Sequence, residues 1–152
     1  WELTLEAWRS LETVHETGSA RQIGLSNCYD PDLLRALLTA AKTKPATLQN
    51  RFYRDTGYDR EIRQICLEEQ IIYQCFWTLT ANPHILSSPV IQEISQSKNK
   101  TAEQVFFRFI HQEGIQILTG TTNPEHMSQD LAIFEFELND SEVAAIRNLG
   151  PF

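Results

Sequence analysis

Short apolar stretches alternate about four times with longer stretches of helical periodicity along this chain. The strand-like stretches are residues 21–27, 46–53, 71–79 and 115–122. No Asn-Gly hairpin turn joins one such stretch to another. Alternation of this kind is typical of βαβ units, so we predict an α/β fold with a parallel sheet covered by helices.

Helix starts are marked clearly between these stretches. A capping residue followed by Pro predicts three starts, at Asp30-Pro31, Ser88-Pro89 and Asn123-Pro124. Capping boxes predict two more, from Thr101 with Gln104 and from Asn139 with Glu142. Residues 59–70 form an amphipathic pattern that we expect to bury Ile62, Ile65 and Cys66.

The first helical pattern covers residues 3–15. It places one apolar face toward the core, formed by Leu3, Ala7, Trp8, Leu11 and Val14. The chain opens at Trp1, with no initiator Met, and runs directly into this pattern. We therefore expect a piece of a longer protein.

Charge and composition exclude several classes of function. The 152 residues carry a formal net charge of −7, which argues against a nucleic-acid or anionic-membrane partner. No apolar run reaches the roughly 18 residues of a transmembrane helix, and no leader pattern is present. The three cysteines have wide spacing without a zinc or disulfide pattern, so we expect reduced thiols, no metal site and a cytoplasmic location.

The carboxyl ends of the predicted strands are polar, small or aromatic, whereas the strands themselves are apolar. These ends read Ser26-Asn27, Gln49-Asn50, Trp77-Thr78 and Gly120-Thr121-Thr122. Function gathers at this end of parallel sheets. The pattern therefore predicts a pocket for a polar and mostly uncharged ligand.

The helix start at Asn123 follows the last strand directly. Its backbone N–H groups favour an anion. However, no Lys or Arg lies between Arg108 and Arg147, so charged support for a phosphate is missing from this segment.

An ordered series of segments resembles one enzyme family. "GSARQIGLSNCYDPDLLRALL" (18–38) resembles the aldo-keto reductase segment Gly-Lys-x-Arg-x-Ile-Gly-Val-Ser-Asn-Phe, and "PATLQNRFY" (45–53) resembles the next strand of that family with its Gln. "YQCFWTLT" (73–80) is similar to the strand that carries a nicotinamide-stacking Tyr. Residues 117–149 resemble the last strand, the phosphate-binding turn and the closing helices.

The resemblance implies a TIM-type (β/α)8 barrel, which needs about 250 residues. The match covers essentially residues 1–152 as an incomplete domain, the C-terminal half of the barrel. The family's catalytic Asp, Tyr, Lys and His belong to earlier strands, so the resemblance implies no catalytic residue here. Tyr53, Tyr58 and Tyr73 match no catalytic motif, and the histidines other than His126 are interpreted as structural.

The resemblance does imply much of a site that binds a nicotinamide cofactor. Ser26, Asn27 and Gln49 match the residues that bind the carboxamide, and Phe76 matches the stacking ring. The remaining implied positions are Trp77, Thr78 and Leu79 over the pyrophosphate, Gly120, Thr121, Thr122, Asn123 and His126 around the adenosine ribose, and Gln129 and Asp130 near adenine. Purely structural interpretations stay open for these residues. Ser26 and Asn27 could form a turn that closes the strand, Gln49 could be a hydrogen-bonded amide of the barrel core, and Phe76 could pack in the core.

One departure bears on the choice between NAD and NADP. Many members clamp the 2′-phosphate of NADP with a Lys and an Arg, and here Gly120 and His126 stand at those positions. A phosphate without these partners loses charge-assisted bonds of roughly 1.5–3 kcal/mol each. We therefore expect the complete enzyme to tolerate NAD, or to bind NADP more weakly than members with the pair.

Two functions of different class remain. The first is part of an NAD(P)-dependent aldo-keto reductase that acts on a small carbonyl substrate once an N-terminal half completes it. The second is an inactive truncated half-barrel that serves as a binding or interaction module. Both predict self-association or a partner that covers exposed sheet edges.

Overall fold

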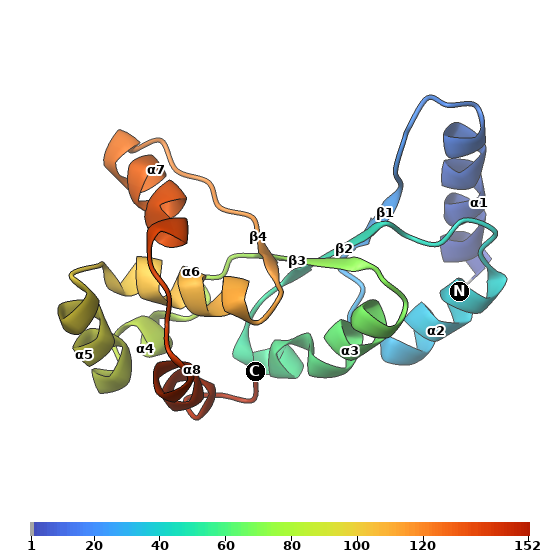
Figure 1. Cartoon of the computed structure of the whole chain (residues 1–152). Helices are drawn as coiled ribbons and strands as arrows, with labels where there is room; N and C mark the ends of the chain where they lie inside the picture. Colours follow the sequence, from blue (N-terminus) through green and yellow to red (C-terminus); the bar gives the residue numbers. More distant parts are fainter. Residues whose placement is uncertain (1) are drawn as a thin grey trace. The chain divides into compact units, whose positions relative to one another are not determined.

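The computed structural model describes residues 2–152, which contain four strands and the helices between them. The strands are neighbours in the order β1-β2-β3-β4, which is also their order along the chain (Figure 1). The chain is thus an α/β protein with a parallel sheet, which confirms the prediction. It divides into two compact units: the residues up to Asn50 with Asp59–Gln74, and Arg51–Tyr58 with Cys75–Phe152.

The first unit holds the beginning of the sheet. Its elements are α1 (Glu2–Glu16), β1 (Gly24–Ser26), α2 (Pro31–Ala40), α3 (Arg60–Glu68) and most of β2 (Thr47–Arg51) and β3 (Ile72–Phe76). β1 pairs with β2 in parallel, with Gly24 opposite Thr47 and Ser26 opposite Gln49. A Cβ on Gly24 would lie 2.7 Å from the carbonyl oxygen of Thr47, so only Gly permits this close approach.

The helices of the first unit follow their sequence signals. The Asp30 carboxylate caps α2 by accepting the N–H groups of Asp32 and Leu33 at 2.9 and 3.1 Å. α3 buries Ile62, Ile65 and Cys66, as its periodicity predicts.

The predicted apolar face of α1 is only partly correct. Trp8 is buried against Ile23 and Leu37. Leu3 is 81% exposed, and Ala7, Leu11 and Val14 are also exposed.

A carboxylate takes the place of the expected apolar contacts in α1. Glu12 is buried beside Trp8 and accepts the backbone N–H groups of Lys42 and Thr43 at 2.7 and 2.9 Å. These bonds lower the pKa of Glu12, the one from Thr43 most, against the raising effect of burial.

The second unit carries the C-terminal helices. Its elements are most of η1 (Arg54–Asp59), α4 (Pro83–Leu86), α5 (Pro89–Lys98), α6 (Ala102–Gln112), β4 (Gln116–Ile117), α7 (Pro124–Leu131), η2 (Ala132–Glu135) and α8 (Asp140–Arg147). An aromatic cluster forms its core, in which Phe152 contacts the rings of Phe52, Tyr58, Phe106 and Phe109. The capping boxes at Thr101 and Asn139 are both present, as predicted.

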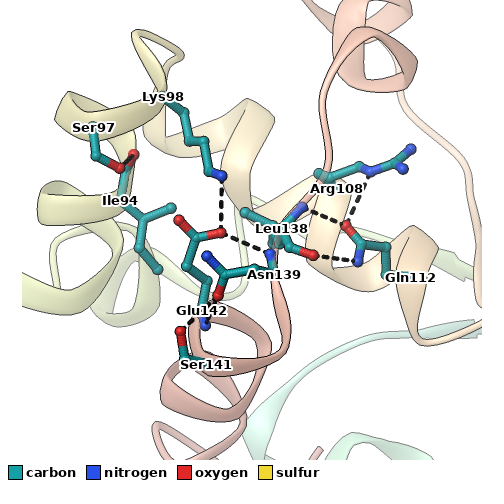
Figure 2. A network of polar contacts seen from close by, with 9 residues as sticks. All are labelled: Ile94, Ser97, Lys98, Arg108, Gln112, Leu138, Asn139, Ser141 and Glu142. Carbon is teal, nitrogen blue, oxygen red and sulfur yellow. Dashed lines mark hydrogen bonds and ion pairs between the residues drawn. The ribbon is translucent and has the colours of Figure 1, made fainter.

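Polar contacts attach α8 to its neighbours in this unit (Figure 2). Glu142 closes the capping box on the Asn139 N–H at 2.8 Å and also pairs with Lys98 of α5 at 3.1 Å. The side-chain amide of Gln112, at the end of α6, contacts the backbone of Leu138 just before α8. The start of α8 is therefore fixed to both α5 and α6.

All four strands are shorter than the stretches predicted from the sequence, since β1 covers only Gly24–Ser26 and β2 only Thr47–Arg51. The third ends at Phe76, because Trp77 has φ of 62° and leaves the extended conformation. The fourth contains only Gln116–Ile117, although Leu118 still donates its N–H to the Cys75 carbonyl at 2.8 Å. The short helix α4 was not predicted.

Two further properties concern the cysteines and the helices of residues 2–152. The cysteines at 28, 66 and 75 are free thiols, as expected. Within residues 2–152, the helices are too short or too polar for any of them to span a bilayer.

Candidate functional site

The strand exit of β1 brings together three of the predicted residues in the first unit. Ser26 and Asn27 are exposed, and Gln49 is half-buried on the neighbouring strand. The Ser26 hydroxyl donates to the Gln49 carbonyl at 3.2 Å, and the Asn27 N–H donates to the same carbonyl at 3.0 Å. The three predicted residues therefore form one connected polar cluster.

Asn27 has a left-handed backbone with φ of 57°, which is uncommon for a residue other than Gly. Its Nδ2 donates to Ser26 Oγ at 3.2 Å, and its Oδ1 accepts from the Tyr29 hydroxyl at 3.2 Å. An amide has two donor hydrogens and two acceptor lone pairs, so Asn27 retains capacity for a ligand. Gln49 uses its Nε2 on Gln74 Oε1 at 2.6 Å and likewise keeps acceptor capacity.

A pocket of about 560 Å³ in the second unit brings together six of the other predicted residues. These are Leu79, Gly120, Thr121, His126, Gln129 and Asp130. The pocket also includes residues that were not predicted: Thr80, Leu86, Thr101, Glu103, Gln104 and Thr119. A volume of this size is typical of small-molecule sites.

The pocket wall on α7 is held from two sides. Gln104 at the start of α6 donates Nε2 to the Gln129 carbonyl at 2.9 Å, while its Oε1 accepts the Thr101 N–H at 3.0 Å. Asp130 accepts from the Thr119 hydroxyl, after β4, at 2.9 Å. One buried Gln thus completes a helix cap and also fixes the opposite wall of the pocket.

The turn into α7 has the geometry that its sequence predicts. Asn123 caps the helix by accepting the Glu125 N–H at 2.9 Å, and the Thr121 hydroxyl accepts the Asn123 N–H at 3.1 Å. Neither Thr122 nor Asn123 lines the pocket, although both are exposed beside it in the chain. His126 lies within α7, and His84 lies within α4.

The charges around the pocket are unfavourable for a phosphate dianion. Among the described residues that line it, the ionisable ones are Glu103, Asp130 and His126, with no Lys or Arg. At Gly120, an added Cβ would meet no atom within 4 Å. The pocket therefore has room at this position for a longer side chain that the sequence does not supply.

The exit of β3 presents its predicted residues differently. Trp77 is 54% exposed, and the Arg51 guanidinium lies 4.0 Å from its ring centroid. Thr78 is buried, and its hydroxyl donates to Cys75 Sγ at 3.1 Å, so its side chain faces the interior. Phe76 is half-buried, and of the four predicted residues in this segment Leu79 lines the pocket, next to the unpredicted Thr80.

Two other kinds of chemistry find little support in the structure. Burial raises the pKa of the Cys66 thiol to about 12, so this thiol is not an activated nucleophile. Within residues 2–152, no group of three or more His, Cys, Asp or Glu side chains is placed to hold a metal ion.

Comparison with known proteins identifies the family. The model of the aldo/keto reductase family matches residues 2–151. The chain belongs to the aldo/keto reductase family. This agrees with the resemblance carried by the strand ends.

Individual aldo/keto reductase relatives support the same conclusion. A probable NAD(P)H-dependent D-xylose reductase of Emericella nidulans is 31% identical over 95% of this chain and 49% of its own length. The crystal structure of an aldo/keto reductase from Brucella melitensis has a TM-score of 0.86 at 23% identity, over 97% of this chain and 56% of that one. Gox0644, solved as a mutant in complex with NADPH, has a TM-score of 0.85 at 23% identity, over 95% of this chain and 52% of that one.

The chain therefore spans about half the length of the aldo/keto reductases that it matches. The solved structures show that its four-stranded parallel sheet has the fold of the corresponding part of an aldo/keto reductase barrel.

Within each unit, the polar groups have the hydrogen-bonding chemistry of a part of a nicotinamide dinucleotide. The amides and hydroxyl at the β1 exit are suited to a carboxamide, and the Thr, Gln and Asp side chains around the pocket are suited to ribose hydroxyls. The fit is poorer for a 2′-phosphate, because the lining residues carry two carboxylates and no permanent cation.

Proposed function

We propose that this chain is the cofactor-binding, C-terminal half of an NAD(P)-dependent aldo-keto reductase. The observation that carries the proposal is the pocket bounded by the exits of β3 and β4 and the starts of α6 and α7. It combines hydroxyl, amide and carboxylate groups, and six of its residues are those that the family resemblance assigns to the cofactor. The polar cluster of Ser26, Asn27 and Gln49 supports a separate role for the first unit in binding the nicotinamide carboxamide.

The expected preference between NAD and NADP follows from the charges of the residues that line the pocket. Glu103 and Asp130 carry carboxylates that accept hydrogen bonds from ribose hydroxyls and repel a phosphate dianion. His126 is the only lining residue among those described that can become cationic. NADP is therefore expected to bind no more than about tenfold more tightly than NAD.

When bound, the nicotinamide supplies or accepts a hydride. Carbonyl reduction also needs a group that protonates the carbonyl oxygen. Two tyrosines are engaged away from the strand exits: Tyr58 is buried, with its hydroxyl 3.4 Å from His84 Nε2, and Tyr73 donates to Asp59. The Tyr29 hydroxyl donates to Asn27 Oδ1 at 3.2 Å, and Tyr29 belongs to no catalytic motif of the family resemblance. The proposal thus assigns binding and orientation of the cofactor to this chain, and assigns the proton donor to a second half.

A second candidate function is a binding or interaction module without activity. Large apolar side chains favour it, because Leu3 is 81% exposed, Leu131 is 74% exposed and Phe134 is 61% exposed. Apolar side chains exposed to this degree commonly mark surfaces that a partner covers.

A binding titration and an activity assay on the purified chain separate the two candidate functions. Titration of NADH, followed by fluorescence, is expected to show saturable binding for the reductase half and none for an unrelated module. Oxidation of NADH or NADPH in the presence of an aldehyde is expected to be absent from the chain alone. Robust turnover by the chain alone would show that the proton donor lies within it.

A further inference from the structure

Asn50 is a fully buried polar side chain of the first unit with three side-chain hydrogen bonds. Its exposed fraction is 0%. Its Oδ1 accepts the Cys28 N–H at 2.9 Å, and its Nδ2 donates to the Cys28 carbonyl at 2.6 Å and to Asp59 Oδ2 at 2.7 Å. Both donor hydrogens and the acceptor of the amide are therefore in use.

Asn50 and Gln49 lie on opposite faces of β2. Side chains alternate between faces along a strand, and here Asn50 shares the buried face with Leu48 while Gln49 is half-buried on the other face. Asn50 consequently cannot contact a ligand that Gln49 contacts. Its effect on such a ligand is therefore indirect, and its bonds to the backbone of Cys28 provide a route to Ser26 and Asn27.

Asp59 fixes the orientation of the Asn50 amide. A carboxylate only accepts hydrogen bonds, so Nδ2 must face Asp59 and Oδ1 is left for the Cys28 N–H. Asp59 Oδ2 also accepts from the Tyr73 hydroxyl at 2.9 Å, and the exposed fractions of Asp59 and Tyr73 are 4% and 5%. Exchange of the amide oxygen and nitrogen would break all three bonds of Asn50.

Backbone strain occurs at both ends of this network. Asn27, which precedes Cys28, has φ of 57°, and Asp59 has φ of 55°. Left-handed backbone at residues other than Gly costs energy and persists only where surrounding contacts hold it. Asn50 supplies such contacts on both sides, since it bonds Cys28 directly after Asn27 and also bonds Asp59.

We propose that Asn50 is a positioning residue for the pair Ser26 and Asn27, with Asp59 and Tyr73 as its support. It holds the backbone of Cys28 so that Asn27 keeps its left-handed conformation and presents its amide at the strand exit. The ligand group concerned is the carboxamide of the nicotinamide, so this inference depends on the proposed function.

Two ligands test the proposal. NADH contains the carboxamide, whereas ADP-ribose shares the rest of the dinucleotide framework and lacks it. Asn50→Ala is expected to raise the dissociation constant of NADH about tenfold and to leave that of ADP-ribose within about twofold of its original value. Tyr73→Phe, which removes the hydroxyl that donates to Asp59, is expected to produce a smaller change of the same kind and guards against misfolding of the first variant.

Glu12→Ala is the matched control. Glu12 is also a buried side chain of the first unit, and it also bonds two backbone groups, those of Lys42 and Thr43. Its replacement is expected to lower the stability of the chain without changing the ratio of the two dissociation constants. A second readout is amide hydrogen exchange at Cys28, which is expected to accelerate in Asn50→Ala and not in Glu12→Ala.

The outcomes are distinguishable. Equal weakening of NADH and ADP-ribose in Asn50→Ala, or unchanged Cys28 exchange, would overturn the positioning role and leave the proposed function intact. Failure of the unaltered chain to bind NADH at all would overturn the proposed function and the positioning role together.

Discussion

The side-chain amide of Gln112 bonds both backbone polar groups of Leu138. Gln112 Oε1 accepts the Leu138 N–H at 2.9 Å, and Gln112 Nε2 donates to the Leu138 carbonyl at 2.9 Å (Figure 2). Arg108 Nε donates to the same Oε1 at 3.0 Å, which fixes the orientation of the amide. An irregular segment between η2 and α8 thus obtains the hydrogen bonds that a neighbouring strand would otherwise provide.

Gln112→Ala is expected to lower the free energy of unfolding of the chain by about 1–3 kcal/mol, because both polar groups of buried Leu138 lose their partner. Denaturant unfolding measures this change. Gln92→Ala is the control, since Gln92 makes a single exposed bond to the Leu86 carbonyl, and its loss is expected to be smaller. Equal losses in the two variants would contradict a special role for the Gln112 amide.

Glu12→Gln tests the link between stability and pH. The pKa of Glu12 is lowered in the folded chain from its ordinary value of 4.5, chiefly by the Thr43 N–H. The resulting stability is present above pH 4.5 and disappears as the pH falls through the lowered folded-state pKa.

The variant cannot ionise at this position. It is therefore expected to be less stable than the unaltered chain at neutral pH and to lose less stability between about pH 5 and pH 3. Thermal unfolding across this range checks the difference, and parallel curves would show that the Glu12 charge contributes nothing.

Positive charges introduced at the pocket are expected to raise its affinity for the 2′-phosphate of NADP. Gly120→Lys combined with His126→Arg places two cations on the pocket, and the space at Gly120 accommodates the new side chain. The affinity for NADP relative to NAD is expected to rise tenfold or more, because each charge-assisted bond contributes roughly 1.5–3 kcal/mol. Gln96→Lys adds one positive charge on α5 at a residue that does not line the pocket, and no change in the ratio is expected from it.

Self-association is expected from the exposed apolar side chains of α7 and η2. Sedimentation velocity at micromolar concentration is expected to show species larger than one chain. Leu131→Lys with Phe134→Lys is expected to reduce them, because the two side chains are 74% and 61% exposed. A compact monodisperse monomer from the unaltered chain would contradict this expectation.

Local signals predicted the helix starts well. The capping boxes at Thr101 and Asn139 depend on residues three positions apart, so the sequence contains the whole interaction. The parallel sheet was also predictable, because the alternation of strand and helix patterns limits the possible connections.

Features that depend on distant residues were not predictable in the same way. Asn50 was noted only as a polar strand end, and its bonds to Cys28 and Asp59 exist only in the folded unit. Glu103 was not predicted because it lies in an ordinary first helical turn, and only folding places it on the pocket. Trp77 was expected to continue a strand, but its φ of 62° ends the strand.

The most direct test of the account is calorimetric titration of the unaltered chain with NAD and with NADP under identical conditions. We predict that NAD and NADP both bind and that the dissociation constant of NADP is no more than about tenfold below that of NAD. NADP that binds more than about tenfold more tightly than NAD, or a chain that binds neither dinucleotide, would contradict it.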